Sequence, residues 1–399
     1  DNDTRRVSEV RLGPQAGIDN GTRGVMFFDH FESWRDQGFT LNSSVTHPVD
    51  TFEVVRAMQP NQNVESAYPI GSNTRAVALQ GPYAYVGVGS QMMILNVANL
   101  TYPTVVGQTG VLMGKVEGVT VAGRYAYVAS DGEGMHIIDI ADPSNPIEVG
   151  FHDTPGYALD VALMGSYAYV AAGDSGLRIV DVTNPAAPVE VGSYDMAGYA
   201  VDVALAGSYA YVAAENSGLR IVDVTNPAAP VEVGSYDMAG SIISVSVAIP
   251  YAYLVDRDSG LRILDVSNPM APVEVGFYET LGVAIEDVVL AGHYAYVVDE
   301  DGGLRIVDVT NPAAPVEVDT YNISGSIVEV AVAGHYALIA TGAGGLVILK
   351  FVSEGVHYLP LVVRDHRLSH LAPSTPQPSE SFNPTNQPVW SSPSATPEP

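Results

Sequence analysis

Carboxylates in short, glycine-bounded loops are the residues of this chain best suited to chemistry. Two such loops read Asp256-Arg257-Asp258-Ser259-Gly260 and Asp299-Glu300-Asp301-Gly302-Gly303. Spaced aspartates in a turn offer hard oxygen ligands, which Ca²⁺ prefers. We therefore predict a calcium site with the candidate ligands Asp256, Asp258, Asp299 and Asp301. Neither loop has the later glutamate of an EF-hand, so solubility and turn formation are the alternative explanation of these acids.

The other reactive residue types form no constellation typical of an enzyme. The nine histidines are scattered, and the pair at helical spacing, His366 and His370, lacks the intervening glutamate of a metalloprotease. The sequence contains no Gly-X-Ser-X-Gly elbow, phosphate loop or dinucleotide fingerprint. We therefore predict a protein without catalytic residues, and without a cofactor other than the candidate calcium.

A charge pattern with fixed spacing recurs along the chain. Four arginines each precede a glutamate by 12 residues, in the pairs Arg178 and Glu190, Arg220 and Glu232, Arg262 and Glu274, and Arg305 and Glu317. His136 keeps this spacing with Glu148, whereas Met93 is followed at the same distance by Val105. Base and acid are thus present together or absent together. This predicts a cross-strand ion pair, with a ligand-binding ring of arginines as the alternative.

These charges belong to a repeat of roughly 42 residues that fills the chain from about residue 75 to about residue 350. Its marker, Tyr-Ala-Tyr, begins at Tyr83 and returns at steps of 42 or 43 residues, with a final variant at Tyr336. Within the unit 157–198, four runs rich in Val, Ile, Tyr and Leu alternate with turns rich in Gly, Pro, Asn and Asp. Such a unit predicts a four-stranded antiparallel blade. Seven units predict an all-β, seven-bladed β-propeller.

The third predicted strand of the unit is apolar on both faces and carries a recognisable motif. It reads Leu177-Arg178-Ile179-Val180-Asp181 and recurs from Leu219, Leu261 and Leu304. A strand apolar on both faces is expected where a blade is packed between two others. The motif resembles the LVIVD repeat of secreted and surface proteins of bacteria and archaea. The resemblance implies a propeller outside the cytoplasm and supplies no catalytic residues.

The last repeat lacks its fourth strand, because no Asn-Pro turn follows Leu346-Val347-Ile348-Leu349. A spare copy of that strand, Asn63 to Tyr68, precedes the first repeat. We predict that this N-terminal segment closes the ring as a strand clasp that leaves no open edge. The residues predicted to make the closure are Val64, Tyr68, Leu346 and Ile348.

Composition favours a location outside the cell. The chain has 45 acidic residues against 17 basic ones, a net charge of -28 and no cysteine. This balance repels nucleic acids and anionic lipids, so we predict neither as a partner. No apolar run is long enough to span a membrane. The start at Asp1, without an initiator Met or an apolar leader, is expected of an exported protein whose signal peptide has been removed.

Two arms of different character flank the predicted propeller. We divide the chain into an aromatic-rich N-terminal arm (1–60), the propeller (61–352), an apolar linker (353–368) and a Ser/Thr/Pro-rich tail (369–399). The N-terminal arm holds Trp34 and five of the nine phenylalanines, and the tail holds Trp390. Large aromatic side chains dominate interfaces between subunits, although an arm folded over its own propeller would also bury them. The residues predicted for an interface are Phe27, Phe28, Phe31, Trp34 and Trp390.

The sequence therefore favours an extracellular, non-enzymatic structural protein. We predict that it is a subunit of a surface filament, tube or layer, joined head to tail to copies of itself through its arms. The loops between the second and third predicted strands gather acids on one face of the ring, which we call the acidic face: Asp131, Glu133, Asp174, Glu215, Asp256, Asp258, Asp299, Glu300 and Asp301. The alternative function is a monomeric adhesion module of the cell surface that binds a glycan or a protein at this acidic face, with Ca²⁺.

Overall fold

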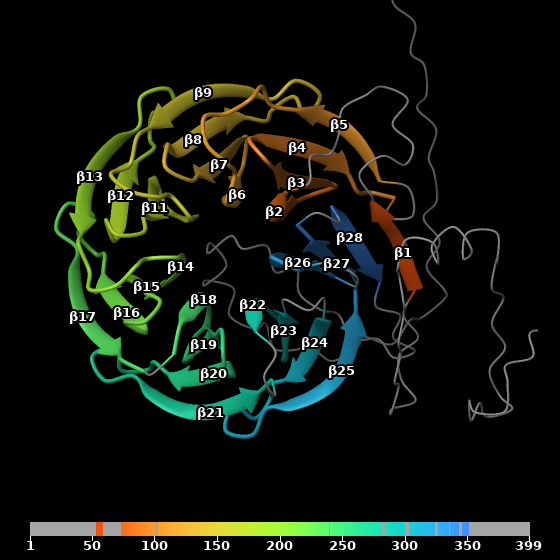
Figure 1. Ribbon diagram of the computed structural model, residues 1–399. Coiled ribbons are helices and arrows are strands. Elements are labelled where there is room, and N and C mark those ends of the chain that lie inside the picture. Colours follow the sequence, from red (N-terminus) through yellow and green to blue (C-terminus); the bar gives the residue numbers. More distant parts are fainter. Residues whose placement is uncertain are drawn as a thin grey trace, which may run out of the picture.

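The computed structural model describes residues 53–58, 73–99, 103–238, 240–280, 284–299, 303–323, 326–334, 336–342 and 345–350. Its regular structure consists of β-strands, arranged as seven sheets of four antiparallel strands. Viewed along the ring axis, the sheets follow one another in chain order as the blades of a propeller (Figure 1). The predicted seven-bladed fold is thus confirmed.

Blade 3 illustrates how the repeat folds. Its strands are β10 (Asp160–Met164), β11 (Tyr167–Ala171), β12 (Leu177–Asp181) and β13 (Val189–Tyr194), hydrogen-bonded in that order. The turn between β10 and β11 contains Gly165 at φ 63, a left-handed conformation that glycine adopts without a steric penalty. The innermost strand lies near the axis and the fourth strand forms the outer rim (Figure 1).

The remaining blades repeat this order. Blade 1 contains β2 (Thr74–Gln80), β3 (Tyr83–Val88), β4 (Gln91–Asn96) and β5 (Thr104–Gln108), and blade 2 contains β6 (Gly118–Ala122), β7 (Tyr125–Ser130), β8 (Gly134–Asp139) and β9 (Ile147–His152). Blade 4 contains β14 (Asp202–Ala206), β15 (Tyr209–Ala213), β16 (Leu219–Asp223) and β17 (Val231–Tyr236), and blade 5 contains β18 (Ile242–Ala248), β19 (Tyr251–Asp256), β20 (Gly260–Asp265) and β21 (Val273–Glu279). Blade 6 contains β22 (Ile285–Ala291), β23 (Tyr294–Asp299), β24 (Gly303–Asp308) and β25 (Val316–Asn322), and blade 7 contains β26 (Glu329–Ala333), β27 (Tyr336–Ala340), β28 (Leu346–Lys350) and β1 (Glu53–Met58).

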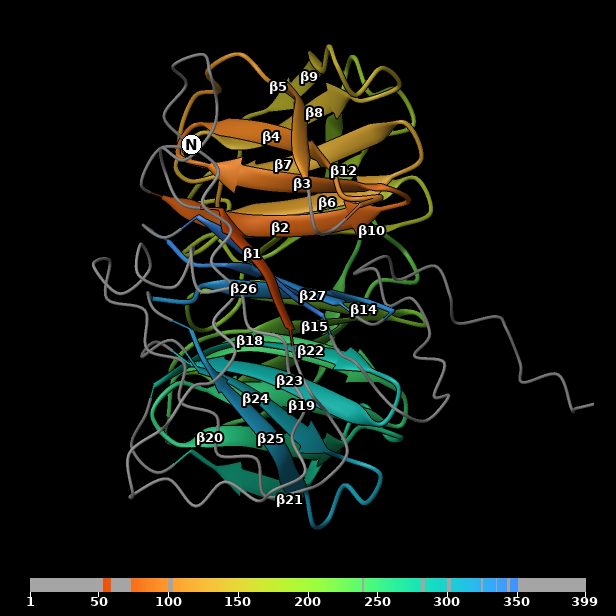
Figure 2. The same cartoon turned by 90° about the vertical axis from the view of Figure 1, so that its right-hand side faces the viewer.

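The hydrophobic core is divided among the seams between neighbouring blades, and the side view shows the sheets stacked face to face (Figure 2). In β12, Leu177 and Ile179 pack in the seam with blade 4, whereas Val180, and Val182 directly after the strand, pack in the seam with blade 2. Both faces of the strand are therefore buried. This explains why the third strand lacks the alternation of polar and apolar residues that a sheet with one wet face shows.

Glycines on the fourth strands admit the Asn-Pro turn of the following blade. A Cβ atom on Gly192 would lie 2.1 Å from the carbonyl oxygen of Pro227, and one on Gly150 would lie 1.8 Å from that of Pro185. No side chain fits at such a distance, so these positions need glycine. Blade 6 has Asp319 at the corresponding position, because blade 7 has no Asn-Pro turn to approach it.

The seventh blade is completed by β1, which pairs antiparallel with β28. Its register places Val54 opposite Leu349 and Arg56 opposite Ile348, with a bulge at the position where the fourth strand of blade 3 also bulges. This differs from the predicted clasp. Val64 and Tyr68 lie outside the described residues, and the edge of β28 that they were predicted to occupy lies beside β1.

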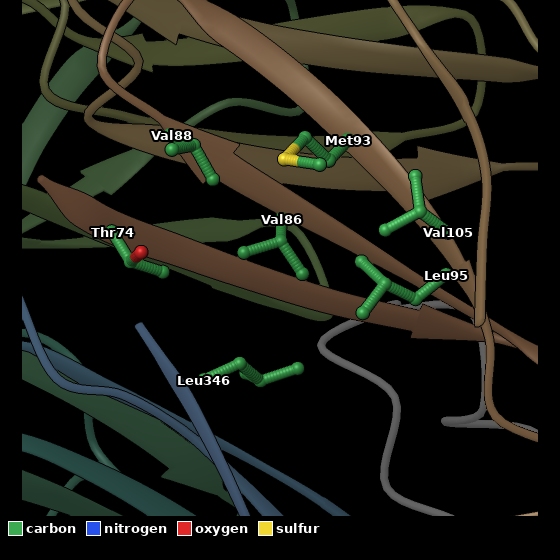
Figure 3. A pocket seen from close by; sticks show the side chains of 7 residues that line it. All are labelled: Thr74, Val86, Val88, Met93, Leu95, Val105 and Leu346. Atoms are coloured by element: carbon green, nitrogen blue, oxygen red, sulfur yellow. The ribbon is translucent and has the colours of Figure 1, made fainter. Parts of the chain in front are cut away.

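The seam between blades 7 and 1 is also held by main-chain hydrogen bonds. Thr74 and Gly342 form an isolated β-bridge with N–H···O distances of 2.9 and 3.0 Å. Beside this bridge lies a small apolar cavity of about 10 Å³, lined by Thr74, Val86, Val88, Met93, Leu95, Val105 and Leu346 (Figure 3). A cavity of this size holds one water at most, and only where polar groups surround it. The seam between blades 7 and 1 is therefore less completely filled than a close-packed interior.

Candidate functional site

The acidic loops do not form a grouped metal site in the described part of the chain. Asp256 and Asp299 are buried, and their carboxylates bind Arg262 at 2.8 Å and Arg305 at 3.2 Å. Asp258 is exposed, and Asp301 lies outside the described residues. No three histidine or carboxylate side chains of the described ranges are grouped as metal ligands. Calcium binding stays a prediction, in which the two arginine-bound aspartates are the least available ligands.

A second set of carboxylates, on the innermost strands, connects consecutive blades. Asp160 Oδ2 accepts a hydrogen bond from Val203 N at 3.2 Å, and Asp202 Oδ2 accepts one from Val245 N at 2.7 Å. The remaining bonds of this kind join Asp287 to Val330 N at 3.1 Å and Glu329 to Val77 N at 3.0 Å. The last of them crosses the ring closure. These buried acids thus satisfy backbone donors of the next blade, a structural role that the sequence alone did not reveal.

The predicted arginine–glutamate ion pairs are confirmed. The nitrogen–oxygen distances are 3.6 Å for Arg178 and Glu190, 3.5 Å for Arg220 and Glu232, 3.2 Å for Arg262 and Glu274, and 3.1 Å for Arg305 and Glu317. Each arginine also binds a second carboxylate. In blades 3 and 4 this is the exposed Asp195 or Asp237, and in blades 5 and 6 it is the buried Asp256 or Asp299.

Each of three glutamates on the outer strands also accepts a hydrogen bond from the preceding blade. Tyr194 donates to Glu232 at 3.0 Å, Tyr236 donates to Glu274 at 3.1 Å, and Tyr278 donates to Glu317. Burial, followed by the bond to Glu317, raises the pKa of Tyr278 to about 12. We name these linked contacts, with the arginines, the glutamate ladder. It ties the outer rims of blades 3, 4, 5 and 6 to one another.

The face that carries the Asn-Pro turns is chemically different from the acidic face. Each fourth strand of blades 2 to 6 begins with an exposed aliphatic residue directly after a proline: Ile147, Val189, Val231, Val273 and Val316. Val231 keeps 57% of its surface exposed, and Met270 in the turn of blade 5 keeps 74%. We call these six side chains the valine belt. A ring of apolar groups at one rim is a feature of interaction surfaces.

The predicted interface residues Phe27, Phe28, Phe31, Trp34 and Trp390 lie outside the described residues. Sequence reasoning missed the aliphatic residue that follows each Asn-Pro turn. The signal was the repeated Pro-Val pair, which places a β-branched apolar residue at the start of a strand whose outer edge is open. Within the described ranges, no helix is long and apolar enough to cross a membrane.

The fold and its contacts define a closed seven-bladed β-propeller, a class that generally serves structural or binding roles. The chain belongs to the LVIVD repeat family, which matches residues 71–110, 113–154, 155–196, 197–238, 239–280, 284–323 and 324–350. No curated protein matches the sequence closely enough to carry an argument.

Two solved structures support the fold alone. The propeller domain of Cps50 (Swd1) from Myceliophteria thermophila is 13% identical with a TM-score of 0.60, and the match covers 72% of this chain and 99% of that domain. The computationally designed protein Ika8 is 7% identical with a TM-score of 0.55, and the match covers 70% of this chain and 96% of Ika8. At these identities the likeness says nothing about a shared activity.

Proposed function

We propose that this protein is a non-enzymatic structural subunit that assembles with copies of itself outside the cell. The observation that carries the proposal is the valine belt on the Asn-Pro face, opposite a strongly acidic face. Its extracellular location is supported by the sequence resemblance to secreted and surface LVIVD proteins.

Charge restricts how two copies can approach each other. With a net charge of -28, two acidic faces repel. On the Asn-Pro face of blades 3 to 6, residues 183–188, 225–230, 267–272 and 310–315 are uncharged, and the acids at this rim are the aspartates opposite the belt valines: Asp181, Asp223, Asp265 and Asp308. Burying a half-exposed valine contributes about 1 kcal/mol, so the belt stabilises a contact without requiring an ion pair. The Asn-Pro face is therefore the side of the ring on which a neighbouring subunit fits best.

The aromatic arms supply the second half of the proposed contact. Phe27, Phe28, Phe31 and Trp34 would dock on the next subunit, with Trp390 of the tail as a further anchor. A contact between two different surfaces is heterologous, and it produces an open filament unless its rotation closes a ring. The proposed product is thus a filament, tube or layer of propellers.

The experiment compares the sedimentation of the full chain with that of a belt variant, Met270→Glu with Val273→Glu. We expect the parent protein to form large species and the variant to sediment as smaller ones, because two new charges oppose contact at the belt. The matched control is Val111→Glu with Met113→Glu, which also adds two acids at exposed apolar positions but not in an Asn-Pro turn. If belt variant and control assemble equally, the Asn-Pro face is not the contact.

A binding module is the second candidate, favoured by one exposed and one partly buried tyrosine beside the acidic loops. Tyr157 is 49% exposed and packs over Gly132, while Tyr199 lies against Gly173. Burial, and then the nearby Asp174 and Glu215, raise the pKa of Tyr199. Tyrosine faces beside carboxylates suit a glycan or a cationic group. A chain that stays monomeric at high concentration, with Ca²⁺ present, and that binds glycans would favour this candidate over assembly.

A further inference from the structure

Three seams between blades contain a side chain that the seam between blades 7 and 1 lacks in the described part of its core. Met196, in the connection from β13 to β14, packs between blades 3 and 4 with 8% of its surface exposed. Leu112 and Ile323 pack in the same way between blades 1 and 2 and between blades 6 and 7. The described core between blades 7 and 1 has no such member, and this is the seam that contains the apolar cavity (Figure 3).

The cavity lies at the position that corresponds to Met196. Leu346 and Val86, which line the cavity, have the same places in their strand pairs as Leu177 and Val212. Leu177 and Val212 belong to the hydrophobic cluster that contains Met196. A side chain equivalent to Met196 would therefore lie in the cavity between blades 7 and 1.

The spacing of the repeat identifies Ile70 as this equivalent. Met196 precedes Ala200 by four residues, and Ala200 forms the β-bridge through which blade 4 contacts blade 3. Thr74 forms the corresponding bridge between blades 1 and 7, and Ile70 precedes it by four residues. A tyrosine also stands two residues before Ile70 and two residues before Met196. The connection into the first repeat thus carries the same pattern as the connections between later repeats.

The part of the chain that carries Ile70 begins and ends beside the cavity. Met58, the last residue of β1, lies opposite Leu346, and Thr74 is the first residue of β2. Leu346 and Thr74 both line the cavity, and residues 59–72 connect the two strands. Because consecutive Cα atoms are about 3.8 Å apart, Ile70 lies within about 15 Å of Thr74. Ile70 is therefore within reach of the cavity.

We propose that the side chain of Ile70 fills the cavity and completes the hydrophobic core between blades 7 and 1. The lining side chains are apolar apart from Thr74, whose hydroxyl has no hydrogen-bond partner among the described residues. A water in this cavity would find too few polar partners, whereas a methyl group of similar size gains apolar contacts. Ile70 then attaches the first blade to the last one in addition to the pairing of β1 with β28, and this contact is independent of the proposed assembly.

The first experiment uses the absence of cysteine from the chain. A single thiol is introduced into the full chain by Ile70→Cys, and its reaction with an uncharged maleimide is timed in the folded protein. The references are Met196→Cys, at a buried position, and Val111→Cys, at a position that is 79% exposed. We expect Ile70→Cys to react more than about tenfold more slowly than Val111→Cys, because burial protects a thiol until the structure opens. A rate within about tenfold of that of Val111→Cys would overturn the proposal.

The second experiment locates Ile70 by a double-mutant cycle with Leu346, measured as the midpoint of thermal unfolding. Ile70→Ala should lower the midpoint by about 2 to 4 °C, whereas the control Ile18→Ala in the N-terminal arm should leave it unchanged. The double variant Ile70→Ala with Leu346→Ala should lose less than the sum of its single variants, because the two side chains share one cavity. The matched pair Ile70→Ala with Leu177→Ala, in different seams, should be additive. An unchanged midpoint for Ile70→Ala, or additive losses with Leu346→Ala, would contradict the inference.

Discussion

At the scale of single residues, two buried threonines at the closing seam have opposite surroundings. Thr74 Oγ1 has no hydrogen-bond partner among the described residues and borders the cavity between blades 7 and 1 (Figure 3). Thr341 Oγ1 donates to the carbonyl oxygen of Gly345 at 2.8 Å. Both side chains are fully buried. An unsatisfied buried hydroxyl destabilises the fold, whereas a satisfied one is costly to remove.

The pair gives a prediction with a built-in control. Replacing Thr74→Val should raise the free energy of unfolding by about 1 kcal/mol, because a methyl group replaces an unpaired hydroxyl of similar size. Replacing Thr341→Val should lower it by about 1 kcal/mol, because the Gly345 carbonyl loses its donor. Urea unfolding of both variants measures the difference. Equal effects of the same sign would show that the hydroxyl environments do not decide stability here.

Aspartates at the ends of the third strands predict a loss of stability in acid. The Thr183 hydroxyl, and then its backbone N–H, lower the pKa of Asp181, and Thr225 does the same for Asp223. A carboxyl whose pKa is lowered on folding stabilises the fold above its ordinary pKa of about 4, and this contribution is lost as the pH falls through the lowered value. Urea midpoints should therefore decline below about pH 4, and less steeply in Asp181→Asn with Asp223→Asn. Parallel acid profiles of parent and variant would refute this assignment.

At the scale of elements, the Asn-Pro turn and the glycine of the preceding blade form one interlocking contact. Replacing Gly192→Ala should destabilise the protein by about 1 to 3 kcal/mol, because the added methyl group meets the Pro227 carbonyl oxygen. The control is Gly110→Ala, where nothing lies within 4 Å of the new atom. Thermal unfolding of the two variants tests the contact, and a tolerated Gly192→Ala would mean that the turn can move away.

The role of β1 can be tested by two truncations. Removing residues 1–52 leaves β1 intact and should leave the unfolding midpoint unchanged. Removing residues 1–58 takes away the partner of β28, and should cost about 2 kcal/mol through lost ladder hydrogen bonds and an open edge. If both truncated chains are equally stable, a later segment such as Asn63 to Tyr68 completes the blade.

At the scale of the whole molecule, the repeat made the ring predictable from sequence. The spacing from Tyr83 to Tyr336 reports seven local folding units, and the 12-residue spacing of Arg178 and Glu190 reports their cross-strand register. β1 could not be found in this way. Its pairing with β28 depends on main-chain hydrogen bonds, which leave no residue pattern in the sequence, and its residues Glu53–Met58 do not resemble Val189–Tyr194.

The composition of a loop does not show whether its carboxylates are free to bind Ca²⁺ or are already bound by an arginine, and the calcium prediction depended on that difference. Asp256 and Asp299 stand where blades 3 and 4 have Ala172 and Ala214, and each binds the arginine that follows six residues later. The exposed Asp195 and Asp237 perform that task in blades 3 and 4. Comparing the repeats position by position would have revealed the exchange of an exposed acid for a buried one.

The central claim is that propellers of this chain assemble through the Asn-Pro face. The most direct measurement is electron microscopy of the full chain at increasing concentration, with the orientation of each ring determined within the particles. We expect filaments, tubes or sheets in which the valine belt of one ring contacts a neighbouring subunit while the acidic faces stay apart. Single dispersed rings at every concentration, or assemblies joined through the acidic faces, would contradict it.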